Sequence, residues 1–203
     1  MKIEIRLPAA LYDEIIRDLA RRHPFAAERV GFVMGRLGSV AGNGKLILLT
    51  RYLSIPDDHY VRDRSVGARI GPEAMTAAMQ AVYQGRSERE GIFHIHLHEH
   101  RGPTRMSIVD RNETPRLIPG FQSVGKDAAH GIIILSQDHG SGWVWLPSAQ
   151  ASVLASAMTV LGSPVRVFEQ VSEEPVGSPA SRFLRWLANW GSSIWSWVAR
   201  RWS

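Results

Sequence analysis

The sequence contains no cysteine among its 203 residues. Disulfide frameworks, thiolate zinc sites and cysteine nucleophiles are therefore excluded, and any metal must be bound by histidine, aspartate or glutamate. There is also no internal repeat and no apolar run long enough to span a bilayer. A chain of this length can bury one substantial core, so we expect one domain of catalytic size and a short tail.

Most of the net positive charge of the chain lies near the end of the sequence. The formal net charge is +5, and Arg182, Arg185, Arg200 and Arg201 supply most of the excess. The rest of the chain is nearly neutral, which predicts no nucleic-acid partner. Residues 1–6 alternate charged and apolar side chains instead of forming the apolar core of a signal peptide. We therefore expect a cytoplasmic protein.

Hydrophobic periodicity predicts an α/β domain over residues 1–172, a linker at 173–180 rich in Glu, Pro, Gly and Ser, and a tail at 181–203. Short apolar runs bounded by turn residues indicate strands, and apolar residues at helical spacing indicate helices. The expected elements are a strand at 2–6, a helix through Leu11, Ile15 and Leu19, a hairpin of 29–37 and 45–53, a helix opening at Gly71, a strand at 91–98, a helix beginning at Ser107, strands at 131–136 and 142–146, a helix at 149–161 and a strand at 165–169.

The most unusual segment is the strand expected at residues 91–98, because apolar residues alternate there with histidines. Side chains at i and i+2 of a strand point to the same side, so two imidazoles can converge on one metal ion. The histidines in and after this strand, of which two could bind one ion, are His94, His96, His98 and His100. A lone histidine on a strand usually has a structural role, which we expect for His94, His130 and His139.

A third ligand and a general base are also present in the sequence. Asp110 follows at the expected start of a helix capped by Ser107, and it can complete a set of two histidines and one aspartate. Such a set leaves one tetrahedral position of zinc for a water whose pKa falls to about 7. Glu28, which directly precedes the first strand of the hairpin, is the candidate base for that water.

Together these residues resemble the JAB/MPN metalloproteases that carry the JAMM motif, which combines an upstream Glu with His-x-His and Ser-x-x-Asp. The matching residues are Glu28, then His96-x-His98 or His98-x-His100, then Ser107-x-x-Asp110. The resemblance covers roughly residues 1–170 and is greatest to the prokaryotic branch associated with ubiquitin-like conjugation systems. It implies an MPN/JAB-type (cytidine-deaminase-like) fold, a mixed β-sheet flanked by helices.

The resemblance also implies an activity, that of a deubiquitinase-like zinc isopeptidase or peptidase with one Zn²⁺ per chain. Such an enzyme cleaves after the C-terminus of a ubiquitin-like protein, in a precursor or a conjugate. Glu28 would be the general base and Ser107 would stabilise the oxyanion. Two alternatives stay open, a catalytically silent MPN scaffold and a zinc peptidase with an unrelated substrate.

The spacing of the motif leaves two histidine registers. His98 lies one residue farther from Ser107 than in the usual motif, and His100 lies one residue nearer. We favour His96, His98 and Asp110 as the ligands, because a surface loop accommodates an insertion at low cost. The alternative set is His98, His100 and Asp110.

Residues 181–203 are predicted to form an amphipathic helix rich in Trp and Arg. Such a helix can lie on a membrane surface, dock on a protein partner or a second copy, or pack on its own domain. Its apolar residues at helical spacing are Phe183, Trp186, Leu187, Trp190, Ile194, Trp197 and Val198.

Overall fold

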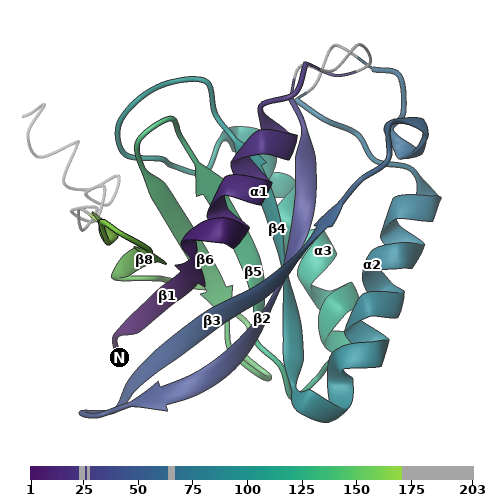
Figure 1. The fold of residues 1–203 in the computed structure, drawn as a ribbon. Coiled ribbons are helices and arrows are strands. Elements are labelled where there is room, and N and C mark those ends of the chain that lie inside the picture. Colours follow the sequence, from purple (N-terminus) through teal and green to yellow (C-terminus); the bar gives the residue numbers. More distant parts are fainter. Residues whose placement is uncertain (23–25, 27, 64–66, 171–203) are drawn as a thin grey trace, which may run out of the picture. The chain divides into compact units, whose positions relative to one another are not determined.

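The computed structural model describes residues 1–22, 26, 28–63 and 67–170 (Figure 1). Within these residues a nine-stranded mixed sheet has helices on both faces. The elements in chain order are β1 (Ile3–Pro8), α1 (Ala9–Leu19), β2 (Val30–Val40), β3 (Gly44–Ser54), the 3₁₀ helix η1 (Asp57–His59), α2 (Pro72–Gly85), the 3₁₀ helix η2 (Arg86–Glu88), β4 (Glu90–Leu97), α3 (Ile108–Val124), β5 (His130–Leu135), β6 (Gly140–Trp145), β7 (Val153–Leu154), β8 (Ala157–Leu161) and β9 (Arg166–Glu169).

The strand order in the sheet is β7-β6-β5-β4-β2-β3-β1-β8-β9. The pairs β1–β3, β1–β8 and β4–β5 are parallel, and all the other described pairs are antiparallel. The sheet curls, because β6 and β8 touch although they are far apart in this order. A Cβ atom on Gly142 of β6 would overlap Ile5 of β1, so a glycine is needed where the curled sheet closes on itself.

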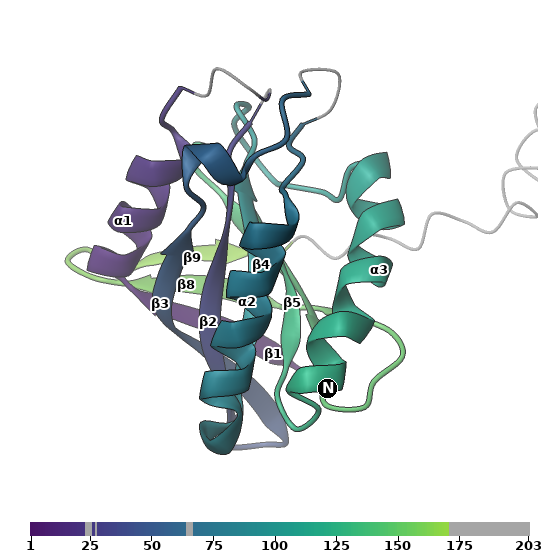
Figure 2. The ribbon, with the colours of Figure 1, turned by 90° about the vertical axis from the view of Figure 1, so that its right-hand side faces the viewer.

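Two apolar cores lie on the two faces of the sheet. The helical spacing of Leu11, Ile15 and Leu19 is confirmed, since these side chains are buried by α1 against β1, β3 and β8. On the other face α2 and α3 lie side by side and bury a second core that includes Phe32 and Phe121 (Figure 2). The expected mixed sheet flanked by helices is therefore present.

The helix predicted at residues 149–161 is wrong. This segment forms β7 and β8, and β8 pairs in parallel with β1. Met158 and Val160 are buried, whereas their neighbours are not, which is the period of two of a strand. Pairing with β1 is a long-range interaction that local periodicity does not reveal, and it outweighs the helical preference of the alanines and leucines.

The compact unit that the structure describes ends at Gln170. Residues 171–203 hold the end of the expected domain, the linker at 173–180 and the amphipathic tail at 181–203, and they lie outside the described residues. Among the helices of the described part, none combines the length and the hydrophobicity needed to cross a bilayer.

Candidate metal centre

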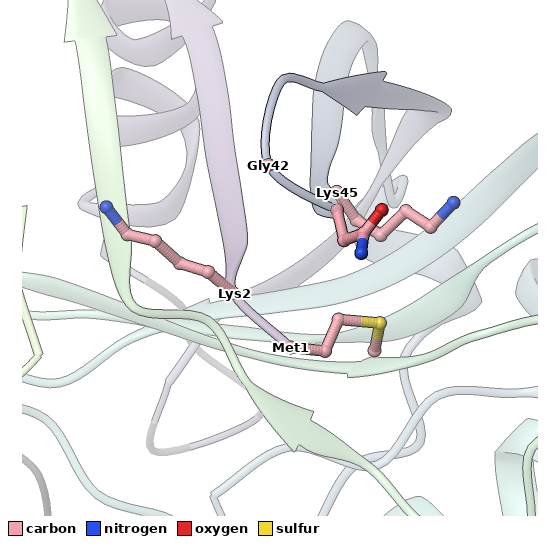
Figure 3. Close-up of a pocket in the computed structure, with 5 residues that line it drawn as sticks. Met1, Lys2, Gly42 and Lys45 are labelled. Atoms are coloured by element: carbon pink, nitrogen blue, oxygen red, sulfur yellow. The ribbon is translucent and has the colours of Figure 1, made fainter.

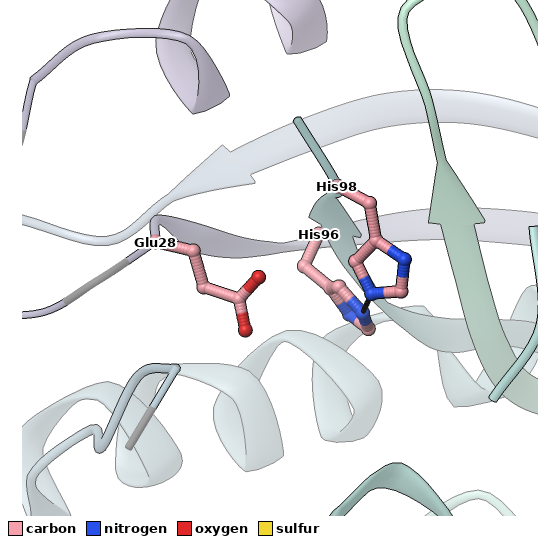
Figure 4. Close-up of side chains that lie close together, drawn as sticks. All are labelled: Glu28, His96 and His98. Carbon is pink, nitrogen blue, oxygen red and sulfur yellow. Dashed lines mark hydrogen bonds between the residues drawn. The ribbon is translucent and has the colours of Figure 1, made fainter. Parts of the chain in front are cut away.

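The register of the sheet brings Glu28 to the histidines. Strands β2 and β4 are antiparallel, and Val30 pairs with His96. Continued by two residues, the same register sets Glu28 opposite His98, which directly follows the last residue of β4. Figure 4 shows the carboxylate of Glu28 and the two imidazoles pointing toward one another.

The spacing of the two imidazoles suits a metal chelate. The Nε2 atoms of His96 and His98 lie 3.1 Å apart. Two imidazole nitrogens bound to one tetrahedral ion at about 2.0–2.1 Å are separated by about 3.3–3.4 Å. Candidate ligand atoms of Glu28, His96 and His98 all lie within 4.8 Å of one another. These three residues can therefore hold a metal ion with little rearrangement.

Asp110 reaches the same place from the first turn of α3. Its Oδ1 lies 3.7 Å from Nε2 of His96. Its Oδ2 accepts the N–H of Ser107 at 2.8 Å, while Ser107 Oγ accepts the N–H of Asp110 at 3.1 Å. This capping box confirms Ser107 as the N-cap of α3. It also fixes Asp110 so that one carboxylate oxygen serves the cap and the other faces the histidine.

Loss of this cap is expected to destabilise the metal-free protein. Ser107→Ala removes the Oγ acceptor, and the loss of an N-cap costs about 1 kcal/mol of unfolding free energy. Ser123→Ala is a matched control, because Ser123 is exposed and its hydroxyl donates to Gly120 in the last turns of the same helix. Urea denaturation in the presence of chelator measures both. Equal stability of the two variants would contradict a structural role for the box.

His100 does not join the group that contains His96 and His98. It is exposed, and its Nδ1 lies 3.0 Å from the carbonyl oxygen of Arg101. The loop that carries it is held by Gln137, whose Nε2 donates to the carbonyl oxygen of Glu99 at 2.6 Å. The geometry therefore favours the register of His96 and His98 over that of His98 and His100.

Both histidines of the group are poised as neutral ligands. Burial, reinforced by His94 and opposed by Asp110, lowers the pKa of His96 to about 3. Burial also lowers the pKa of His98. A neutral imidazole keeps a lone pair for a metal ion.

Burial opposes ionisation of Asp110, but the charge of a protonated His96 and the hydrogen bonds from Ser107 hold the pKa of Asp110 below the usual range. Because His96 is neutral at neutral pH, we attribute the ionised state of Asp110 there mainly to Ser107.

Glu28, unlike Asp110, has a raised pKa, because its charged form is disfavoured. Burial first, and then the negative charges of Asp110 and Glu99, raise the pKa of Glu28 from 4.5 to about 7. A carboxylate with a pKa near the working pH both accepts and returns a proton readily. A bound dication would shift this pKa back downward.

Replacing Glu28 by the neutral isostere is expected to stabilise the metal-free protein at alkaline pH. The pKa of Glu28 is raised in the folded state, so its ionisation costs stability as the pH rises from 4.5 through about 7. The cost is absent below pH 4.5. Glu28→Gln should therefore raise the melting temperature of chelator-treated protein at pH 8 and leave it unchanged at pH 4. A lower melting temperature at pH 8 would contradict this electrostatic account.

The segment that precedes β2 is anchored by contacts that the sequence did not reveal. The hydroxyl of Tyr60 accepts the N–H of Val30 at 3.1 Å and donates to its carbonyl oxygen at 2.8 Å. Arg29, which is buried, pairs with Asp57 at 2.5 Å. Both partners lie in the stretch between β3 and α2, which has no periodicity in the sequence. Only a three-dimensional structure shows that this stretch holds the segment next to Glu28.

The remaining histidines of the described core have local roles. Nε2 of His130 lies 2.9 Å from the carbonyl oxygen of Gly125, and its Nδ1 accepts the N–H of Ile92 at 3.2 Å. His130 is thus a satisfied core residue, as expected. The ring of His94 packs against those of Phe32 and His96, with centroid distances of 5.7 and 5.6 Å. This packing is a structural role, as expected for His94.

Two pockets in the described part lie away from the candidate metal centre, and none of its residues lines them. One, of about 650 Å³, is lined by Met1, Lys2, Gly42, Asn43 and Lys45 beside the β2–β3 turn, at the far end of β2 from Glu28 (Figure 3). It offers no metal ligand. The other, of about 360 Å³, is mainly apolar and lies between the end of β3 and α2.

Comparisons with known proteins add little. No family model and no curated protein matches the sequence. Among solved structures, the chain is similar to the Trichoplax adhaerens STIL N-terminal domain, with 12% sequence identity and a TM-score of 0.25. The match covers 66% of this chain and 36% of that one. A likeness this low supports no inference about function.

Proposed function

We propose that this chain is a zinc-dependent peptidase or isopeptidase of the JAB/MPN type. The observation that carries the proposal is the convergence of Glu28, His96, His98 and Asp110 at one point from three separate segments. The mixed sheet flanked by helices and the element order up to α3 are compatible with the MPN-type fold that the sequence resembles.

The donor set supports zinc as the metal. Two imidazole nitrogens and one carboxylate oxygen, with no sulfur, are ligands that zinc accepts in catalytic sites. His96, His98 and Asp110 would provide three ligands and leave the fourth position open. Glu28 would then face that open position instead of the ion, and its raised pKa suits a proton carrier better than a permanent ligand.

In the proposed mechanism, the protein's own side chains move one proton and stabilise one charge. Bound zinc would polarise the scissile carbonyl and acidify the attacking water. Glu28 takes a proton from that water as its oxygen bonds to the carbonyl carbon, and it delivers the proton to the leaving nitrogen as the C–N bond breaks. The Ser107 Oγ lone pair is engaged by the N–H of Asp110, so its own hydrogen is free to donate to the developing oxyanion.

The proposed substrate is a peptide or isopeptide bond after the C-terminus of a ubiquitin-like protein. Only the resemblance of the motif supports this choice. Membrane or protein docking by residues 181–203 rests on their amphipathic pattern.

Two alternative functions stay open, a zinc peptidase for another substrate and a silent scaffold. An intact set of Glu28, His98, Ser107 and Asp110 argues against the scaffold.

A cleavage panel tests the proposal. Purified protein with added zinc is incubated with ubiquitin-like proteins fused or isopeptide-linked to a reporter, and with unrelated peptides of the same length. We expect cleavage after the ubiquitin-like C-terminus, its loss on treatment with chelator, and its recovery with zinc. Cleavage of the unrelated peptides alone would support a different peptidase. No cleavage of any substrate by zinc-loaded protein would favour the scaffold.

A further inference from the structure

The main chain around Gly67 lies directly against the side chain of Glu28. Gly67 belongs to the returning arm of the stretch between β3 and α2, where Tyr60 bridges Ile70 and the N–H of Val61 donates to Arg69 at 2.8 Å. The N–H of Glu28 donates to the carbonyl oxygen of Gly67 at 2.9 Å. The arm therefore lies beside both the main chain and the side chain of Glu28.

No side chain fits at position 67 while Glu28 lies where it does. A Cβ atom on Gly67 would overlap Oε1 of Glu28 and would lie 2.9 Å from its Cδ and 3.4 Å from its Cγ. The three nearest atoms all belong to Glu28. The Glu28 side chain thus extends along the bare Cα of Gly67, and the arm forms one wall of its site.

Space is what requires glycine here. A methyl group at position 67 meets the side chain of Glu28 first, so the Glu28 carboxylate must move to make room for it.

We propose that Gly67 is a positioning residue for Glu28, whose carboxylate is directed toward His96 and His98 by the space that the missing side chain leaves. The proposal rests on the proposed function. The arm itself is held by the bridge between Tyr60 and Ile70 and by the hydrogen bond from the N–H of Val61 to Arg69, so the free end of Glu28 gives way more easily than the arm.

The first test is a kinetic comparison of Gly67→Ala with wild type. A misplacement of about 1 Å in a reacting group can cost about 10²-fold in rate, so we expect kcat to fall about 10- to 100-fold. KM, bound zinc and the melting temperature should stay near wild type, because the built Cβ has no ligand histidine or Asp110 among its nearest neighbours. Gly38→Ala is the matched control, since its Cβ would meet nothing closer than 3.8 Å.

A double variant shows whether Gly67 acts through Glu28. In the Glu28→Gln background, Gly67→Ala should cause no further loss of kcat, because the group that it displaces is already inactive. An additional 10-fold loss, or a Gly67→Ala enzyme with the kcat of Gly38→Ala, would overturn the inference.

A measurement without turnover separates this inference from the proposed function. In zinc-loaded protein, the side-chain carboxyl ¹³C resonance of Glu28, assigned by its absence in Glu28→Gln, should shift in Gly67→Ala and not in Gly38→Ala. A shift in a protein that cleaves nothing would support the positioning and refute the peptidase. An unshifted resonance in an active enzyme would overturn the positioning and leave the peptidase intact.

Discussion

Glu28→Gln is expected to reduce kcat by about 10²–10⁴-fold, the usual contribution of a general acid–base, and to leave bound zinc at the wild-type level. Glutamine keeps the shape of the side chain but accepts no proton. Its amide would occupy the place of the carboxylate beside His96 and His98. Steady-state kinetics and elemental analysis of the same preparation measure both quantities.

Glu99→Gln is the matched control for this variant. Glu99 is exposed and close enough to raise the pKa of Glu28, but it is not in the group that can hold a metal. Its replacement should change kcat by less than about threefold, since it removes one charge and no reacting group. If Glu28→Gln lost its zinc as well as its activity, Glu28 would be a ligand and another group would have to be the base.

The second large effect is expected at the histidines. His98→Ala should reduce bound zinc from about one ion per chain to a trace, because His98 supplies one of only three proposed protein ligands. His96→Ala should do the same, since its Nε2 lies 3.1 Å from that of His98. His100→Ala should retain zinc, because His100 is exposed and its Nδ1 contacts a backbone carbonyl. Elemental analysis after gel filtration measures all three variants.

The outcome of this series also separates the two registers. Retention of zinc by His96→Ala together with its loss in His100→Ala would reverse the register that the geometry favours. Circular dichroism of each metal-free variant controls for misfolding, which is a concern at His96 because it is almost fully buried, with 2% of its surface exposed.

Most elements of the sheet and its helices were predictable because their signals are local. The apolar spacing from Leu11 to Leu19 marks α1, and the Ser107 cap marks the start of α3. The alternation of apolar residues with histidines marks β4. These patterns depend on neighbours a few residues away, so the sequence alone contains them.

The parts that could not be predicted depend on long-range contacts. Strand β8 forms because it pairs with β1, more than half the chain away, and its alanines and leucines gave a misleading helical pattern. The candidate ligands were found by residue type and spacing, but the nearness of Glu28 to His98 follows from strand register. Tyr60 and Gly67, which hold the Glu28 segment, lie in a stretch without periodicity and gave no signal.

The most direct test of the proposed zinc centre is an anomalous difference map at the zinc edge from crystals of zinc-loaded protein. We predict one strong peak bonded to Nε2 of His96, Nε2 of His98 and Oδ1 of Asp110, with the Glu28 carboxylate facing the open position. The absence of a peak among these residues would contradict the account, as would a peak bonded to Glu28 in place of Asp110.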